Sequence, residues 1–258
     1  MDELRFELVD ASTFQAIPAP RPPGARCQSC DYWERLDGHR ELPADLSTSE
    51  TASREAAKLA RLLAGERLGG SYGMLAFRPG GASGGESDGE APGSDAPIGW
   101  AQFGPISAYP RAQAIRDRYP ALPASPPPWV ITCLQLIDRH EEAASELLEA
   151  VCAALDRRGV SVVEAYPEGM GDPWLSSVGP AAAYRASGFE LAAGDERYPV
   201  YRRELTGESS DEADWAKLLR SPADDEGEWP LPIPRQPSDD DLFRLPQKPR
   251  RPNPFGED

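Results

Sequence analysis

Long apolar runs are absent from this sequence. No stretch of about 18 consecutive apolar residues occurs, so no membrane-spanning helix is predicted. The first ten residues, MDELRFELVD, are charged and strand-like, and they lack the basic and apolar segments of a secretory signal. We therefore expect a cytoplasmic protein, in which cysteines remain reduced rather than forming a disulfide framework.

Positive charge is also scarce. The chain has 27 basic residues against 43 acidic ones, which gives a formal net charge of −16. Non-specific binding to nucleic acid or to anionic lipid needs a basic surface, so we expect neither a nucleic-acid nor a membrane partner. The hydrophobic content of 40% suffices for one sizeable core if it is concentrated in part of the chain.

Histidine and cysteine are too few for a paired metal site. The sequence has two histidines and four cysteines. A structural zinc ion takes four ligands, and the one Cys-x-x-Cys motif, Cys27 and Cys30, supplies two. We predict no metal. Three interpretations of the motif remain open: a packed turn, the wall of a substrate pocket beside Tyr32 and Trp33, or a thiol or metal sensor.

Large hydrophobic residues are missing from several stretches. Residues 79–96 consist of Gly, Ser, Pro, Ala and acids, which is typical of a flexible surface loop. Residues 120–128, PALPASPPP, are expected to form an extended connector. Residues 206–258 are acidic and proline-rich, with too little apolar surface to fold alone. We therefore predict one domain over 1–205 and a disordered tail over 206–258, which either docks onto a protein partner or stays solvated.

The rest of the chain alternates strand and helix patterns. One helix begins at the capping box Ser47–Glu50 and stops at Gly69, and others are predicted over 139–158 and 180–187. Strands are predicted over 4–10, 71–78, 98–104, 129–138, 160–167, 189–193 and 198–205. The strands on either side of the helix 139–158 should be parallel, and the last two strands should form a hairpin.

Four segments, taken in order, resemble the GNAT N-acetyltransferase superfamily over roughly residues 1–205. They are IGWAQFGP (98–105), the cofactor-binding strand and helix WVITCLQLIDRHEEAASELLEA (129–150), the "vEgyP"-like VSVVEAYPE (160–168), and the Y-x-x-x-G-F element AAAYRASGFEL (181–191). CQSCDYWE (27–34) matches a Cys-x-x-Cys motif of one bacterial branch. The resemblance implies an α/β (α+β) fold: a mixed, mostly antiparallel sheet with one parallel crossover, flanked by helices.

The resemblance also implies a site for an acyl-CoA, with acetyl-CoA as the co-substrate. In the family the central strand splays from the next strand and the pantetheine lies in the gap. The backbone of Leu134, Gln135 and Leu136 would then face the thioester carbonyl. The pyrophosphate is held at a helix N-terminus by a loop of pattern Arg/Gln-x-x-Gly-x-Gly/Ala. That loop maps, in order, onto Arg139, His140, Glu141, Glu142, Ala143 and Ala144.

Glu142 stands where this loop pattern has its middle glycine. Two like charges about 4 Å apart repel by about 4 kcal/mol at an effective dielectric near 20, and the side chain also hinders close approach of the backbone. However, acids in the first turn stabilise a helix, and Asp138 with Glu141 is an ordinary N-cap pattern. Two interpretations stay open: a weakened or lost cofactor site, or glutamates that turn into water.

Two side chains are candidates for proton transfer. Tyr184 matches the family's tyrosine four residues before Gly188, which implies a general acid for the departing CoA thiolate; a tyrosine packed on the sheet is the alternative. Glu164 is a candidate general base, because burial raises the pKa of a carboxylate; a chain of water molecules is the alternative. His140 falls in the first helical turn with no partner for a base role.

Two functions follow from these patterns. The first is an acyl-CoA-dependent N-acyltransferase that moves an acetyl group onto an amine of a small molecule or a peptide. The second is a catalytically impaired protein of the same fold, which acts as a binding or interaction module through its fold and its tail. The loop at Glu142 discriminates between them, since only the first requires acetyl-CoA to bind.

Overall fold

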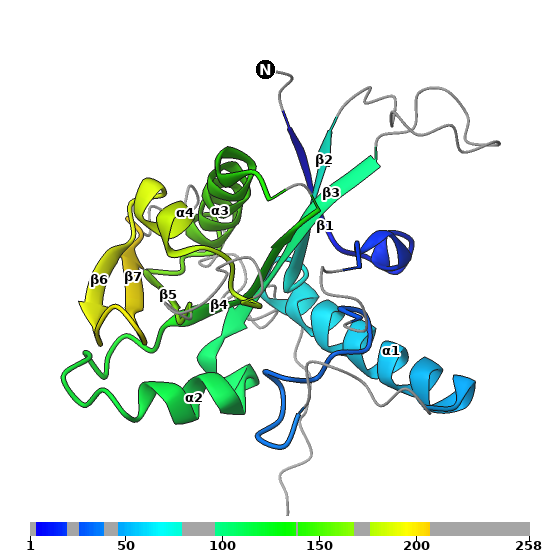
Figure 1. Ribbon diagram of the computed structural model, residues 1–258, viewed down its shortest axis with the longest axis horizontal. Helices are drawn as coiled ribbons and strands as arrows, with labels where there is room; N and C mark the ends of the chain where they lie inside the picture. Colours follow the sequence, from blue (N-terminus) through cyan, green and yellow to red (C-terminus); the bar gives the residue numbers. More distant parts are fainter. Residues whose placement is uncertain are drawn as a thin grey trace, which may run out of the picture. The chain divides into compact units, whose positions relative to one another are not determined.

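The protein is built around a seven-stranded sheet with the strand order β1-β2-β3-β4-β5-β7-β6 (Figure 1). The computed structural model describes residues 4–19, 26–38, 46–78, 96–137, 139–167 and 176–206. The strands are β1 Arg5–Leu8, β2 Gly73–Arg78, β3 Ala96–Pro105, β4 Trp129–Leu136, β5 Val162–Ala165, β6 Glu190–Ala193 and β7 Val200–Glu204. All neighbouring strands are antiparallel except β4 and β5, which are parallel. The predicted mixed sheet is therefore confirmed.

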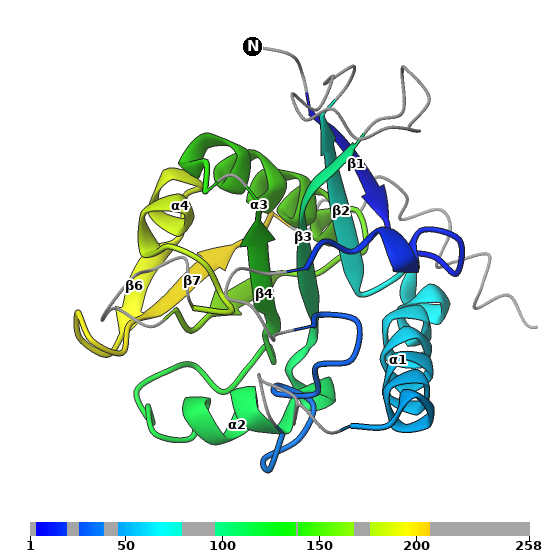
Figure 2. The ribbon, with the colours of Figure 1, turned by 45° about the vertical axis from the view of Figure 1, so that its right-hand side comes forward.

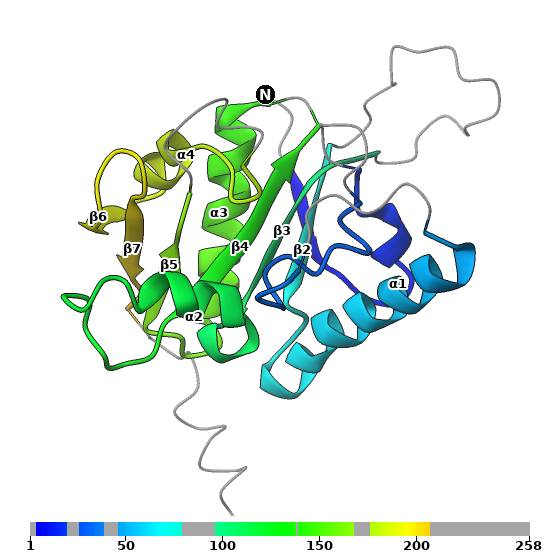
Figure 3. The ribbon, with the colours of Figure 1, turned by 60° about the horizontal axis from the view of Figure 1, so that its bottom comes forward.

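Helices cover both faces of this sheet. In the described residues the α-helices are α1 Thr48–Leu63, α2 Pro110–Arg116, α3 Glu141–Asp156 and α4 Ala181–Ala186, with 3-10 turns at Phe14–Ala16, Ala64–Leu68 and Ile106–Ala108. α1 and α2 lie on one face of the sheet, and α3 and α4 lie on the other (Figure 3). No helix in the described ranges is long and apolar enough to cross a membrane.

α1 begins at the residue that the sequence predicts. The Ser47 hydroxyl accepts the N–H of Glu50, and the Glu50 carboxylate accepts the N–H of Ser47, which completes the capping box. The following 3-10 turn ends at Gly69, whose φ of 90° is a conformation that glycine adopts without strain. Lys58 and Leu62, one turn apart, are the buried positions of α1.

The predicted strand–helix–strand unit is also confirmed. β4 and β5 are parallel and α3 connects them. The buried positions of α3 recur at helical spacing: Ala143, Ala144, Leu147, Leu148, Val151, Cys152, Ala154 and Leu155. β6 and β7 pair antiparallel, as the predicted hairpin requires. These elements place the end of β4 directly before the start of α3.

α2 has no counterpart among the predicted elements. It contains seven residues, with Pro110 in its first turn, and so short a helix gains little stability from its own sequence. Its Arg111 donates to the backbone carbonyls of Tyr32 and Leu36, each at 2.6 Å. Contacts with a distant segment therefore stabilise this helix, and local sequence patterns do not report such contacts.

The predicted boundaries of the domain, the loop and the tail fall partly within the described residues. Residues 1–210 form one compact unit, which contains the domain predicted over 1–205. Ala96, assigned by its composition to a flexible loop, instead begins β3. The rest of the predicted loop over 79–96 and the predicted tail beyond Thr206 lie outside the described residues.

Candidate functional site

β4 and β5 separate partway along their length. They pair over three positions, from Trp129 to Ile131 in β4. β5 ends there, whereas β4 continues to Leu136 and pairs with β3 along its other edge. Because successive N–H groups of a strand alternate in direction, those of Leu134 and Leu136 face the edge that β5 leaves. The resemblance assigns a pantetheine to the place where β5 ceases to pair with β4.

Residues 176–179, which we call the gap segment, lie along this free edge of β4. The Leu134 N–H donates to the Ser177 carbonyl with an N–O distance of 2.8 Å. The side-chain amide of Gln135 donates to the carbonyls of Ser176 and Ser177 at 2.8 and 3.1 Å. The gap segment thus satisfies the N–H of Leu134, which the resemblance assigns to a thioester carbonyl.

The first turn of α3 lies next to this gap and has no side-chain cap. The N-cap is His140, which is exposed and makes no side-chain capping bond, so the predicted cap at Asp138 is wrong. Unpaired N–H groups at such a terminus attract an anion. The preceding Arg139 has a φ of 53°, an uncommon conformation for any residue but glycine.

A groove of about 420 Å³ runs between the first turns of α3 and α4, which lie side by side (Figure 2). It is lined by Glu141, Glu142, Ser145 and Glu146 of α3 and by Ala182, Ala183 and Ala186 of α4. Glu141, Glu142 and Glu146 are exposed, whereas Ala143 and Ala144 are buried and offer only their backbone to a ligand. Three carboxylates therefore lie beside the helix end at which the resemblance places a pyrophosphate.

Tyr184 is fully buried beside the gap segment. Its hydroxyl donates to the Val178 carbonyl at 2.8 Å, and its ring packs edge-on against Phe189 and stacks with Tyr201. Burial raises the pKa of Tyr184 well above its ordinary value, so the hydroxyl keeps the proton that a general acid must donate. In this structure that proton points to the gap segment.

Glu164 is fully buried within β5, between two guanidinium groups. Arg202 Nη1 and Arg116 Nε lie 2.9 and 3.0 Å from its carboxylate oxygens, and the Tyr166 hydroxyl donates to it at 2.7 Å. Burial and the adjacent Glu164 carboxylate raise the pKa of Tyr166. These contacts link β5 to β7 and α2, and they occupy both oxygens of the candidate base.

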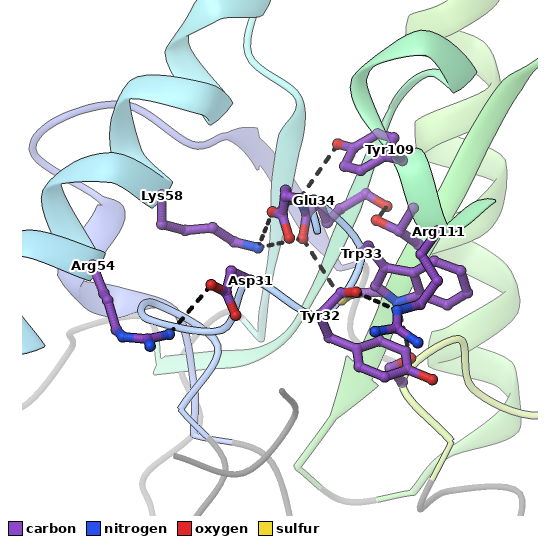
Figure 4. A network of polar contacts seen from close by, with 12 residues as sticks. Asp31, Tyr32, Trp33, Glu34, Arg54, Lys58, Tyr109 and Arg111 are labelled. Atoms are coloured by element: carbon purple, nitrogen blue, oxygen red, sulfur yellow. Dashed lines mark hydrogen bonds and ion pairs between the residues drawn. The ribbon is translucent and has the colours of Figure 1, made fainter. Parts of the chain in front are cut away.

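A buried polar network on the opposite face of the sheet is not predicted from the sequence (Figure 4). Lys58 Nζ lies 2.6 Å from Glu34 Oε1 and 2.7 Å from Gln102 Oε1, and Gln102 Nε2 donates to Glu34 Oε1 at 2.8 Å. Burial disfavours the ionised Glu34, but the Lys58 charge and the hydrogen bonds outweigh it and lower the pKa of Glu34. One feature of the sequence could have indicated this network: Lys58 stands four residues before Leu62, so both fall on the buried side of α1.

The Cys-x-x-Cys motif forms a tight turn, in which the N–H groups of Ser29 and Cys30 both donate to the Arg26 carbonyl. Burial raises the pKa of the Cys27 thiol to about 12, so this thiol is not a nucleophile at neutral pH. The described ranges contain no group of three or more His, Cys, Asp or Glu side chains placed to hold a metal ion. His39 lies outside them.

The segment that follows the motif reaches the gap segment. Trp33 is buried, and its Nε1 donates to Ser177 Oγ at 3.1 Å. Residues 26–38 therefore contact the gap segment through Trp33, and they contribute Glu34 to the polar network. This arrangement is compatible with the pocket-wall interpretation of the motif.

Comparisons with known proteins find similarity in structure alone. No family model and no curated protein matches the sequence. A chain of the NatC complex bound to Gag peptide and CoA is 13% identical over 79% of this chain and 98% of its own, with a TM-score of 0.38. A protein assigned to the GNAT acetyltransferases of Desulfovibrio desulfuricans is 12% identical over 78% of this chain and 98% of its own, with a TM-score of 0.35. A mosquito arylalkylamine N-acetyltransferase like 5b is 10% identical over 79% of this chain and 100% of its own, with a TM-score of 0.41. At these values the similarities assign no activity to this chain.

Proposed function

We propose that the protein is an acyl-CoA-dependent N-acyltransferase that transfers an acetyl group to an amine of a small molecule or a peptide. The observation that carries this proposal is the separation of β4 from β5 directly before the uncapped first turn of α3. Once the gap segment leaves, the strand edge would offer N–H groups to a thioester carbonyl, and the helix end offers N–H groups to phosphate. The order of motifs over 98–191 supports the same function.

Acyl-CoA binding requires the gap segment to leave the edge of β4. Its departure would release two groups together: the Leu134 N–H, which now bonds Ser177, and the Tyr184 hydroxyl, which now bonds Val178. Binding of the substrate and assembly of the site would then be one event, as in enzymes with mobile loops. Both groups would face the position of the thioester.

The released groups have distinct roles in the reaction. The amine nitrogen attacks the thioester carbonyl carbon, and the Leu134 N–H stabilises the negative charge that develops on the carbonyl oxygen. As the C–N bond forms, the C–S bond breaks and the departing sulfur takes the proton of Tyr184. The amine proton passes to water, which reprotonates Tyr184. Glu164 has no part in these steps, because both its oxygens bond neighbouring side chains.

Thermal unfolding with acetyl-CoA tests the binding step of this proposal. A ligand at 100 times its Kd stabilises the folded state by about 2.7 kcal/mol, so acetyl-CoA should raise the melting temperature in a concentration-dependent manner. Release of free CoA thiol in the presence of a panel of primary amines tests the chemical step. If acetyl-CoA neither shifts the melting temperature nor releases thiol with any amine, the protein is not an acyltransferase.

One set of observations favours the second function, a non-catalytic interaction module. The gap segment satisfies the Leu134 N–H, and Glu141, Glu142 and Glu146 line the groove where an anion is expected. In such a protein the gap segment would remain on β4 permanently. Acetyl-CoA would then bind neither to the wild type nor to a variant with Glu142 replaced by glycine.

A further inference from the structure

A second cavity lies between α1 and the Cys-x-x-Cys segment, residues 26–38. Its volume is about 210 Å³. Residues that carry hydrogen-bond donors dominate its lining: Arg35, Arg54 and Arg61, together with Ser29 and Ser53. Cys30, Ala57 and one carboxylate, that of Asp31, complete it. α1 and α3 lie on opposite faces of the sheet (Figure 3), so this cavity, which α1 lines, is distinct from the groove beside Glu142, which α3 lines.

Ser29 is the feature that points to a ligand in this cavity. The residue is 1% exposed, and within the described part of the chain its Oγ has no hydrogen-bond partner. A buried hydroxyl left without a partner costs about 1–3 kcal/mol. A ligand oxygen in the cavity would supply the acceptor that Ser29 lacks.

The charges around the cavity favour an anion. Arg54 Nη1 lies 3.3 Å from the Asp31 carboxylate and Arg35 Nε lies 3.9 Å from it, and Arg35 also pairs with Asp37 at 2.8 Å. Arg61 makes no ion pair with any residue that the structure describes. The lining itself holds three arginines and one carboxylate, a formal charge of +2, in a chain whose net charge is −16. Asp37 and Glu50 are not part of the lining, but they interact with Arg35 and Arg54.

Residues outside the lining hold the Cys-x-x-Cys segment in place beside α1. Arg111 donates to the carbonyls of Tyr32, Leu36 and Gly38, and the buried pair of Glu34 and Lys58 joins the same segment to α1 (Figure 4). A site whose walls are already ordered loses less entropy when a ligand binds. The backbone that carries the lining residues is therefore held in place before a ligand binds.

We propose that this cavity binds a phosphate group, either inorganic phosphate or the phosphate of a small phosphomonoester. Ser29 Oγ would donate one hydrogen bond, and Arg54 and Arg61 would supply charge-assisted bonds to the other oxygens. The volume is below the roughly 300 Å³ of typical ligand pockets and holds several waters at about 30 Å³ each. The site therefore fits one compact charged group.

Calorimetric titration of the full chain with inorganic phosphate tests this proposal. Phosphate should bind the wild type, and Arg61→Ala and Ser29→Ala should each weaken binding about tenfold, the loss of one charge-assisted hydrogen bond. Arg67→Ala is the matched control, because Arg67 is exposed and does not line the cavity. It makes the same charge change and should leave the affinity unaltered. Ser29→Ala removes an unpaired hydroxyl, so this variant should fold with unchanged or slightly higher stability.

Two further ligands identify the source of the phosphate and can overturn the proposal. Methyl phosphate binding at least as tightly as inorganic phosphate would identify a phosphomonoester as the ligand; weaker binding of methyl phosphate would identify free phosphate. Acetate, a single negative charge, should bind more weakly than either. The proposal is wrong if phosphate does not bind the wild type, if acetate binds equally well, or if Arg61→Ala and Arg67→Ala lose the same affinity.

Discussion

Lys58 carries its ammonium group into the space between α1 and the sheet, where its side chain is 2% exposed. A buried charge persists in a folded protein when it is paired and hydrogen-bonded. Glu34 supplies the opposite charge and Gln102 supplies a second acceptor. Because Glu34 comes from residues 26–38 and Gln102 from β3, this side chain fastens an irregular segment to the sheet.

Replacing Lys58 with methionine should destabilise the protein by about 3–5 kcal/mol, because Glu34 then stays buried without its counter-charge. Urea unfolding at neutral pH measures this change. The double variant Lys58→Met/Glu34→Met should recover most of the lost stability, since it leaves no buried charge. A Lys58→Met protein as stable as the wild type would show that the ion pair does not form in solution.

Tyr184→Phe separates the chemical role of this residue from its packing. The variant should lower turnover about tenfold or more without weakening acetyl-CoA binding, because it removes a proton donor, keeps the ring and leaves one bond fewer to hold the gap segment on β4. It should also cost about 1 kcal/mol of stability, since the Val178 carbonyl loses its partner. Tyr198→Phe, at an exposed position, is the control. Turnover unchanged in Tyr184→Phe would assign the proton to another donor.

At the scale of elements, the sequence predicts what depends on local patterns. The capping box at Ser47 and the apolar spacing of α3 each report on a single helix, and both helices form as predicted. α2 is missed because Arg111 stabilises it through a segment about 75 residues away. The start of α3 is misplaced by two residues because its N-cap, His140, has no capping side chain.

Gly179→Ala should drive the gap segment away from β4. Gly179 has a φ of 76°, and a Cβ there would lie 3.0 Å from both the carbonyl oxygen and Cδ2 of Leu134. The Leu134 amide hydrogen should then exchange with solvent faster, as measured by hydrogen-exchange NMR. If the proposed function is right, acetyl-CoA should also bind this variant more tightly.

Gly159→Ala is the matched control for that experiment. Gly159 has a similar φ of 71°, but no atom lies within 4 Å of a Cβ at that position. The two variants therefore share the backbone strain and differ in the contact. Equal exchange of the Leu134 amide in both variants would mean that the gap segment is not displaced by the added methyl group.

At the scale of the whole molecule, the sequence predicts where a site should lie, but it does not predict that the gap segment bonds the groups of that site. The structure brings Leu134, Glu142 and Tyr184, which these motifs contain, to the same end of β4. In the structure Ser177 bonds Leu134 and Val178 bonds Tyr184. These bonds depend on how residues 176–179 lie along the edge of β4, and no local sequence pattern predicts that path. The cavity at Ser29 is missed for the same reason, since α1 and a segment distant in sequence line it together.

Removing residues 221–258 should leave the melting temperature of the remaining chain within about 2 °C of the full-length value. The composition of that stretch offers little apolar surface to bury. A loss of 1 kcal/mol would shift the melting temperature of a domain of this size by about 2–4 °C. A larger, cooperative loss of stability would show that the composition argument is wrong and that these residues support the fold.

The central claim is that the edge of β4 that the gap segment covers and the first turn of α3 bind acyl-CoA, and calorimetric titration with acetyl-CoA tests it most directly. The wild type should bind, and Glu142→Gly should bind more tightly. The variant removes a charge and a side chain at the helix end, and its cost in helix stability is at most about 1 kcal/mol. Glu142→Gln isolates the charge, and Glu66→Gln, at an exposed position outside the groove, controls for net charge. No binding of acetyl-CoA by either the wild type or Glu142→Gly would contradict the claim and leave the interaction module as the function of this fold.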